Sequence, residues 1–231
     1  MRHQKDALRL KLQLLVGMAG GFLLVVMIGV ASADGQPSSD PAMPVELAPA
    51  VVVAAGADSV NTSAVARLSV ETSSGVEQGT AFQLGDGRLA TVAHALVDAR
   101  SAQVDGVDVP LDNGLITRQH DLGSIAAVVL DGELSASDEP GVVGQLVALG
   151  GFGRDGRLEI INGEIISRTS GAGYGIGRPD VYVISATVET GWSGGPVVDS
   201  NGDVLAVIVG VETRSGVTLA VPIEYLPAVS R

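Results

Sequence analysis

The 231-residue sequence contains no cysteine, and this absence excludes several kinds of site at once. Disulfide frameworks, zinc ribbons, iron–sulfur centres and thiol nucleophiles all need cysteine. Lysine is missing beyond residue 33: the ten basic residues there are all arginine, against 25 acidic residues, which gives this part a net charge of −15. Because such a surface repels phosphate backbones, we expect no nucleic-acid partner. We also expect no metal site and no cofactor.

Long uncharged apolar runs are confined to one segment near the N-terminus. Residues 12–30 form a 19-residue stretch without charge, and four basic residues precede it. A spanning helix needs about 20 apolar residues with basic residues on its cytoplasmic side. The Ala31-Ser32-Ala33 sequence that follows also suits cleavage by signal peptidase. Residues 1–33 are therefore a signal peptide or a single transmembrane anchor, and either one places the rest of the chain outside the cytoplasm.

A second segment, residues 34–58, is rich in proline, serine, alanine and glycine and shows no lasting alternation of polar and apolar residues. This composition predicts a flexible linker that spaces a folded domain from the membrane. Residues 59–231 are then the folded domain, which is long enough to bury a core without metal or disulfide cross-links.

Short apolar runs separated by Gly, Asp, Asn and Pro fill the chain from residue 60 onward, a pattern typical of a β-sandwich or barrel. The predicted strands cover residues 65–70, 79–84, 88–93, 122–130, 145–149, 158–167, 181–187, 196–199, 204–211 and 217–221. Helices are predicted only over residues 95–99 and 223–229. Strands and helices do not alternate in the βαβ manner, which disfavours a doubly wound sheet. We predict an all-β domain with a short C-terminal helix, preceded by an N-terminal hydrophobic helix.

Histidine is scarce, and only His3, His94 and His120 are available as a general base. His3 precedes the apolar segment and cannot share a site with an exported domain. His94 follows an apolar strand, opens a short helix, and is flanked by alanines that leave room for a second chain. We therefore single out His94 as the candidate base and expect His120 to be an exposed neighbour.

Ser193 lies in a glycine-rich loop, within the run TGWSGGP over residues 190–196. A nucleophilic serine needs an accessible hydroxyl, and flanking glycines leave it uncovered. It also needs backbone N–H groups aimed at the point where the carbonyl oxygen becomes negative. A tight loop of this kind can point the N–H groups of Gly191 and Ser193 into one oxyanion hole. The alternative is a plain glycine-rich turn.

Three segments carry a resemblance to a known family. GWSGGPVVDSNGDVLAVIVG resembles the nucleophile region of trypsin-like serine proteases, especially the bacterial HtrA/Deg branch. GTAFQLGDGRLATVAHALVD resembles that family's strand–turn–strand ending at the histidine, and QHDLGSIA resembles the segment that carries the acid. The resemblance covers about residues 60–226 and implies a double β-barrel of the chymotrypsin type. The order His, Asp, Ser is also the chymotrypsin order and differs from the orders in α/β-hydrolases and subtilisins.

The resemblance implies a serine endopeptidase that acts on a protein or peptide substrate. Ser193 would attack the scissile carbonyl, His94 would take and return the serine proton, and Asp121 would hold the imidazole tautomer. Gly191 and Ser193 would supply the oxyanion N–H groups.

Asp121 has three rivals for the acid role. Asp105, Asp108 and Asp112 lie in the same stretch between the histidine and serine motifs. We prefer Asp121 because an apolar run follows it directly, which would partly bury its carboxylate beside the histidine.

The expected substrate pocket departs from the family pattern. Trp192 replaces the aspartate that many animal members pair with a new N-terminus, so activation by that route is not expected, and we expect the indole to crowd or line the cleft. Thr187 stands where a trypsin places a carboxylate. Val209, Gly210 and Val211 should lie along the pocket and carry no charge. These residues predict a preference for small or medium apolar residues at the cleavage point.

A catalytically inactive protease-like domain, acting as an extracytoplasmic binding or sensing module, is the alternative function. The joint presence of all three triad residue types and the oxyanion glycines favours the active enzyme. No residues follow Arg231 for a PDZ domain, so peptide-triggered activation through such a module is not expected.

Overall fold

The structure is a computed structural model that describes residues 59–112, 114–117, 120–127, 129–177 and 180–226. The predicted anchor or signal segment over residues 12–30 and the predicted linker over 34–58 lie outside this part of the chain. Among the described residues, no helix has the length and apolar character needed to cross a lipid bilayer.

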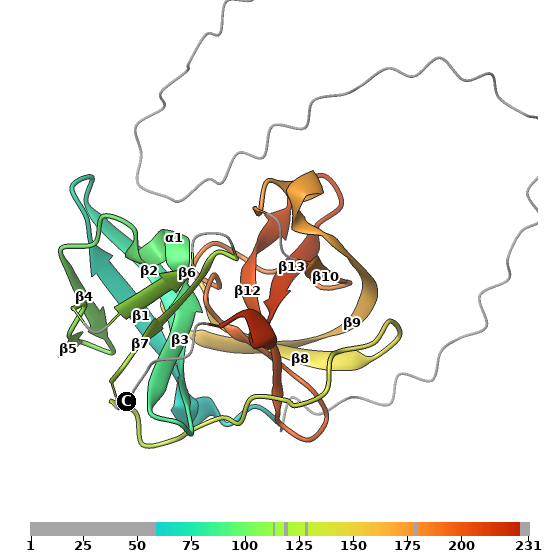
Figure 1. Cartoon of the computed structure of the whole chain (residues 1–231), viewed down its shortest axis with the longest axis horizontal. Coiled ribbons are helices and arrows are strands. Elements are labelled where there is room, and N and C mark those ends of the chain that lie inside the picture. Colours follow the sequence, from blue (N-terminus) through green and yellow to red (C-terminus); the bar gives the residue numbers. More distant parts are fainter. Residues whose placement is uncertain (1–58, 113, 118–119, 128, 178–179, 227–231) are drawn as a thin grey trace, which may run out of the picture.

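The first half of the described chain is a seven-stranded antiparallel sheet (Figure 1). Its strands are β1 (Val65–Glu71), β2 (Val76–Leu84), β3 (Arg88–Val92), β4 (Ser101–Val104), β5 (Val107–Val109), β6 (Gly114–Thr117) and β7 (Leu122–Ile125). Their order across the sheet is β5-β4-β1-β2-β3-β7-β6. Strand β3 therefore lies beside β7, although the chain forms three other strands between them.

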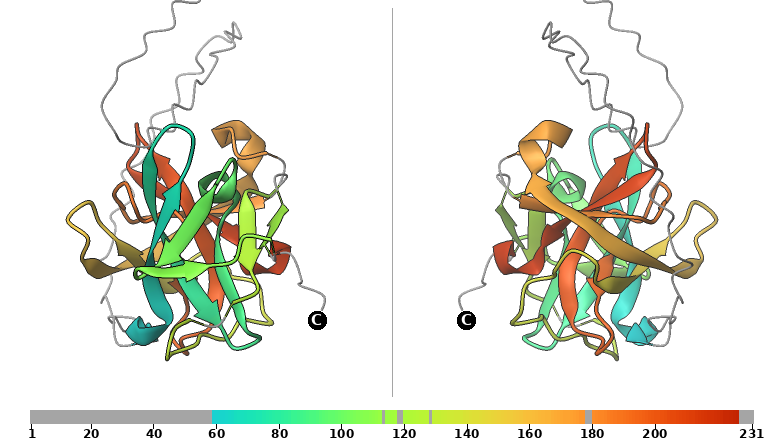
Figure 2. Two further views of the ribbon diagram at one scale, coloured as in Figure 1. Left: turned by 90° about the vertical axis from the view of Figure 1, so that its left-hand side faces the viewer. Right: turned by 90° about the vertical axis from the view of Figure 1, so that its right-hand side faces the viewer.

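The second half is a closed six-stranded barrel. Its strands are β8 (Leu146–Phe152), β9 (Leu158–Ser170), β10 (Asp180–Ile184), β11 (Pro196–Val198), β12 (Val204–Glu212) and β13 (Val217–Pro222). Their order around the barrel is β10-β13-β12-β11-β8-β9. Strand β12 contacts β3 across the junction of the two halves, which Figure 2 shows from two opposite sides. The all-β prediction and its two barrel-like units are thus confirmed.

Strand β12 shows why a nearly continuous apolar sequence is needed at the junction. Its first six residues, VLAVIV, are all buried. Ala206 and Ile208 belong to the core cluster of the barrel, whereas Val207 and Val209 belong to the cluster shared with the first sheet. Successive side chains of a strand point to opposite faces, so a strand buried on both faces must be apolar throughout.

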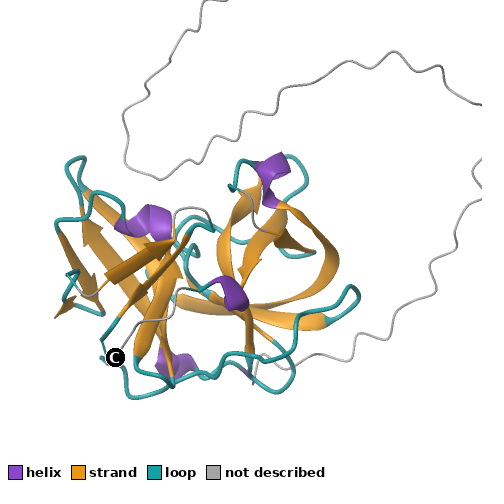
Figure 3. Ribbon diagram, viewed as in Figure 1, coloured by secondary structure: helices purple, strands orange, loops and turns teal. Residues whose placement is uncertain are grey.

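Helix is rare in the described chain (Figure 3). Helix α1 covers Ala93–Leu96 directly after β3, two residues earlier than predicted. Single-turn 3₁₀ helices are η2 (Thr62–Ala64), η3 (Gly171–Tyr174) and η4 (Ile223–Tyr225). Element η4 occupies the start of the predicted C-terminal helix, and residues 227–231 lie outside the described part.

The predicted strand over residues 122–130 is too long, because β7 ends at Ile125. The buried side chain of Gln83 explains the early end. Its amide donates a hydrogen bond to the carbonyl of Ala127 (3.0 Å) and accepts one from the N–H of Val129 (3.2 Å). A side chain thus satisfies backbone groups that a longer strand would have paired with a neighbour.

Candidate active site

The pairing of β3 with β7 brings His94 and Asp121 together. Val92, the last residue of β3, pairs with Leu122, the first residue of β7. His94 lies in α1 just beyond one strand end, and Asp121 lies just before the other. The backbone N–H of Ala93 also donates a hydrogen bond to the carbonyl of Asp121 (3.0 Å). Two residues 27 positions apart are therefore neighbours by register.

The Asp121 carboxylate contacts His94 through both of its oxygens. Its Oδ2 lies 2.6 Å from the imidazole Nδ1, and its Oδ1 accepts a hydrogen bond from the His94 backbone N–H (2.9 Å). The side chains are 23% and 25% exposed, so water screens the pair only partly. Asp121 has a φ of 54°, in the left-handed region that aspartate tolerates better than most residues. With Nδ1 turned to the carboxylate, Nε2 faces away from Asp121.

The three rival aspartates lie elsewhere. Asp105 accepts a hydrogen bond from a backbone N–H of β1 (3.0 Å), and Asp108 accepts one from the Gln103 amide (2.9 Å). Asp112 is exposed. The structure therefore brings Asp121, and none of these three, to His94.

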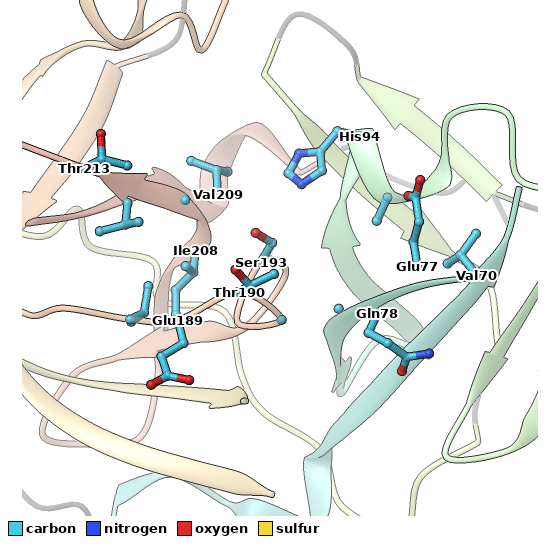
Figure 4. A pocket seen from close by; sticks show the side chains of 16 residues that line it. Val70, Glu77, Gln78, His94, Glu189, Thr190, Ser193, Ile208, Val209 and Thr213 are labelled. Carbon is cyan, nitrogen blue, oxygen red and sulfur yellow. The ribbon is translucent and has the colours of Figure 1, made fainter. Parts of the chain in front are cut away.

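Ser193 and His94 line one pocket between the two halves of the domain (Figure 4). Ser193 comes from the loop between β10 and β11, and His94 comes from the first sheet. Figure 4 labels both side chains among those that line this pocket. No hydrogen bond joins Ser193 to His94 within the described chain; such contacts often form only when substrate binds.

Two glycines give the nucleophile loop its shape. Gly191 has a φ of +103°, and a Cβ there would lie 2.5 Å from the carbonyl oxygen of Phe152. Gly194 has a φ of +91°, and a Cβ there would collide with the carbonyl oxygen of Thr80. Only glycine combines these dihedral angles with so little space. The glycines are thus a packing requirement as well as a means of exposing the serine.

The hydrogen bonds of the loop bear on the predicted oxyanion hole. The carbonyl of Trp192 accepts a hydrogen bond from the N–H of Gly195 (2.9 Å). In a planar trans peptide the following N–H points the opposite way, so the Ser193 N–H is directed away from this bond. The N–H groups of Gly191 and Ser193 make no hydrogen bond to any described residue. No described residue therefore occupies either of the two predicted oxyanion donors.

The pocket walls match the predicted residues only in part. Val209, Gly210 and Val211 line the pocket as expected. Thr187 does not: it is exposed, and its hydroxyl donates a hydrogen bond to the carbonyl of Gly216 (2.7 Å). The apolar wall residues that the sequence did not predict are Val70, Ala95, Val188 and Ile208.

Trp192 does not lie in the cleft, so the expectation that it crowds or lines the cleft is wrong. Its side chain is only 1% exposed and belongs to the core cluster of the barrel. Gly151 on β8 makes room for it, since a Cβ at that position would lie 2.6 Å from the indole ring. The indole Nε1 has no hydrogen-bond partner among the described residues. Trp192 therefore anchors the loop instead of narrowing the pocket.

Two carboxylates lie on the pocket walls and were not predicted. Glu77 comes from β2 and Glu189 from the nucleophile loop. Burial raises the pKa of Glu77 above its usual range, and the nearby His94 opposes this shift. Within the described residues, no three His, Asp or Glu side chains gather as metal ligands.

His120 differs from the exposed residue that the sequence predicts. Its ring stacks on Tyr225, with centroids 4.5 Å apart, and it is half-buried. It does not line the pocket. The structure thus separates His120 from the site and leaves His94 as the histidine beside Ser193.

No family model matches the chain, but sequence comparison finds curated relatives that are named serine proteases. The serine protease Rv3671c of Mycobacterium tuberculosis (strain ATCC 25618 / H37Rv) is 33% identical over 144 residues, which cover 58% of this chain and 36% of that protein. The serine protease MT3772 of strain CDC 1551 / Oshkosh gives the same values. The chain thus spans about a third of the length of the curated relatives it matches.

Structure comparison agrees. The active form of the Rv3671c protease superposes with a TM-score of 0.63 at 24% identity, covering 84% of this chain and 90% of that one. Its inactive form gives 0.60 at 25% identity, covering 70% and 84%. The HtrA-type protease AlgW with a tripeptide gives 0.60 at 20% identity, covering 70% and 56%. The chain is therefore a homologue of the Rv3671c serine protease, with the chymotrypsin-like fold that HtrA-type proteases share.

Proposed function

We propose that the chain is a serine endopeptidase that cleaves peptide bonds through an acyl-enzyme. One observation carries the proposal: the His94–Asp121 pair, with 2.6 Å between Nδ1 and Oδ2, lies on the same pocket as Ser193. The homology to named serine proteases supports this reading of the site.

The chemistry follows from these positions. The Ser193 oxygen attacks the scissile carbonyl while His94 Nε2 takes its proton, and the N–H groups of Gly191 and Ser193 bind the oxygen that becomes negative. The C–N bond then breaks as His94 returns the proton to the leaving amine. Water repeats the sequence on the acyl-enzyme, which releases the acid and restores Ser193. Asp121 holds the imidazole tautomer and stabilises the imidazolium throughout.

The pocket walls support a preference for small or medium apolar residues on the acyl side of the cleaved bond. Val188, Ile208, Val209 and Val211 present hydrocarbon, and Gly210 adds no bulk. A set of peptides that differ only at this residue tests the preference. Valine or alanine should give a higher kcat/KM than arginine or aspartate, and the reverse order would refute it.

Export of the domain is part of the proposal. It rests on the uncharged stretch over residues 12–30, its basic flank, and the Ala-Ser-Ala sequence ending at Ala33. N-terminal sequencing of protein recovered from producing cells separates the two routes. A start near residue 34 indicates a cleaved signal, and an intact N-terminus in the membrane fraction indicates an anchor. Recovery of the chain in the cytoplasm would contradict both.

Hydrolysis of an unstructured protein substrate by the full chain tests the enzymatic proposal. Ser193→Ala and His94→Ala should each lower kcat by about 10⁴- to 10⁶-fold, with no further loss in the double variant, because triad members act as a unit. His120→Ala is the matched control and should keep full activity, since His120 lies outside the pocket. A folded wild-type chain that cleaves nothing would favour the inactive binding module instead.

A further inference from the structure

Thr80, a residue outside the pocket, makes contacts that reach the nucleophile loop. It lies on β2, in the first sheet, and is fully buried. Its hydroxyl donates a hydrogen bond to the carbonyl of Gly191 (2.8 Å), and its backbone N–H donates one to the carbonyl of Ser193 (2.9 Å). One residue of the first sheet therefore holds two residues of a loop that belongs to the other half of the domain.

These two bonds complete the fixation of the loop. The three consecutive carbonyls of Gly191, Trp192 and Ser193 each accept a hydrogen bond, and Thr80 supplies two of the three donors. Gly191 is the most easily rotated of the three residues, because it has no Cβ and a φ of +103°. Its carbonyl and its N–H are attached to the same Cα, so holding the carbonyl resists rotations that would swing the N–H out of the oxyanion hole.

The Thr80 hydroxyl makes a second hydrogen bond. Besides donating to Gly191, it accepts a hydrogen bond from the N–H of Phe152 on β8 (3.0 Å). A hydroxyl has one proton to donate, and the acceptance from Phe152 fixes the direction of that proton. Serine could keep both bonds. Valine, which matches threonine in shape, could keep neither.

We infer that Thr80 is a positioning residue of the oxyanion hole: its hydroxyl sets the orientation of Gly191 across the junction of the two halves. Thr80 does not line the pocket, so it acts through Gly191 and not on the substrate. The inference rests on the proposed function, because an oxyanion hole is used only if Ser193 is acylated. It goes beyond that function because Thr80 belongs neither to the triad nor to the pocket wall.

The experiment compares Thr80→Val, Thr80→Ser and Thr91→Val in the full chain. Thr91 is the matched control: it is equally buried, its hydroxyl donates to the carbonyl of Thr80 (2.8 Å) and lies beside Gly194, but it makes no hydrogen bond to Gly191. We expect Thr80→Val to lower kcat by about 10- to 100-fold with a KM within about threefold of wild type, since mispositioned transition-state donors affect mainly kcat. Thr80→Ser should restore most of kcat, and Thr91→Val should stay within about threefold of wild type.

A second readout does not depend on activity. Amide hydrogen exchange over residues 191–195 should accelerate in Thr80→Val and not in Thr91→Val, because only the first change frees the Gly191 carbonyl. If Thr80→Val does not fold, Thr80→Ala removes the same hydroxyl without adding bulk, and its exchange and kcat are read in the same way.

The outcomes distinguish a failure of the proposed function from a failure of the role inferred for Thr80. If the wild type is inert, the proposed function fails, whereas the exchange comparison still decides whether Thr80 holds the loop. If the wild type is active but Thr80→Val retains its kcat, or loses no more than Thr91→Val, the positioning role is overturned.

Discussion

At the scale of single residues, Asp121 does more than present a carboxylate. Its backbone carbonyl accepts a hydrogen bond from the Ala93 N–H. One carboxylate oxygen accepts a hydrogen bond from the His94 backbone N–H, and the other lies against the His94 Nδ1. The left-handed φ of 54° turns the residue so that all three contacts form together. The position of the imidazole therefore depends on one aspartate at the start of β7.

Replacing Asp121 by asparagine tests this dependence. The amide can still accept the His94 N–H, but its NH₂ group opposite Nδ1 would stabilise the tautomer that carries its proton on Nε2, which cannot take the proton of Ser193. We expect kcat to fall by about 10⁴-fold with little change in folding. The control Asp112→Asn alters an exposed residue and should leave kcat unchanged. A loss of less than about tenfold in Asp121→Asn would remove Asp121 from the mechanism.

Glu77 makes stability depend on pH. Its pKa in the folded chain is raised by burial above the ordinary value of 4.5. Just above that value the folded chain keeps a proton that the unfolded chain has released, so the free energy of unfolding falls as pH rises through this window. In Glu77→Gln this decline disappears.

Urea unfolding at about pH 4 and about pH 7 measures the effect. The difference in stability between Glu77→Gln and wild type should shift in favour of the variant at the higher pH. The exposed Glu139 offers a control, since Glu139→Gln removes the same charge far from the desolvating wall. An equal shift in both variants would show that net charge, and not burial, is responsible.

At the scale of elements, β8 and the nucleophile loop pack closely where β8 has a glycine in place of a larger residue. Gly151 leaves the space that the Trp192 indole fills, and a Cβ there would lie 2.6 Å from the ring. Gly151→Ala must therefore push the tryptophan, and the loop with it. We expect a loss of about 1–3 kcal/mol in the free energy of unfolding, typical of overpacking.

The neighbouring glycine provides the comparison. A Cβ at Gly150 would meet its nearest atom at 3.6 Å, an ordinary contact, so Gly150→Ala should be close to neutral. Trp192 is the only tryptophan of the chain, and its fluorescence should change in Gly151→Ala and not in Gly150→Ala. Equal stabilities of the two variants would show that the indole has room to move.

The elements also show how far the sequence can be read. The strand that ends at His94 and the hairpin after Ser193 follow from apolar runs bounded by turn residues, and the structure contains both. The three strands β4, β5 and β6 were not predicted, because each is three or four residues long and has only two apolar residues. Strand β7 is as short, but the apolar run AAVVL that directly follows it marked its position. A pattern of so few residues cannot be told from a loop.

The position of Trp192 was equally out of reach of the sequence. Whether a residue beside a nucleophile faces the cleft or the core depends on the turn that Gly191 and Gly194 impose and on the space at Gly151, 41 residues earlier. The role inferred for Thr80 depends in the same way on a contact across 111 positions. Contacts between residues so far apart in the sequence depend on how the domain packs, and no local sequence pattern indicates them.

At the scale of the whole molecule, the two halves share an apolar cluster. A single apolar cluster contains Leu68 and Ala90 from the first sheet together with Val198 and Val207 from the barrel. Burial that crosses the junction makes unfolding of one half costly for the other.

We therefore expect the domain to unfold in one cooperative step. Fluorescence of Trp192 reports the barrel, and far-UV circular dichroism reports both halves. The two urea transitions should share one midpoint and one slope. A barrel transition that separates from the dichroism transition would show that the halves are independent, and that their junction does not hold the site together.

Covalent labelling with a fluorophosphonate, followed by mass spectrometry, tests the central claim most directly. The probe reacts with a serine that a neighbouring base activates and an oxyanion hole supports. The account predicts one adduct, on Ser193, that is lost in Ser193→Ala and strongly slowed in His94→Ala. A correctly folded wild-type chain that takes up no probe, or that carries the adduct on another serine, would contradict it.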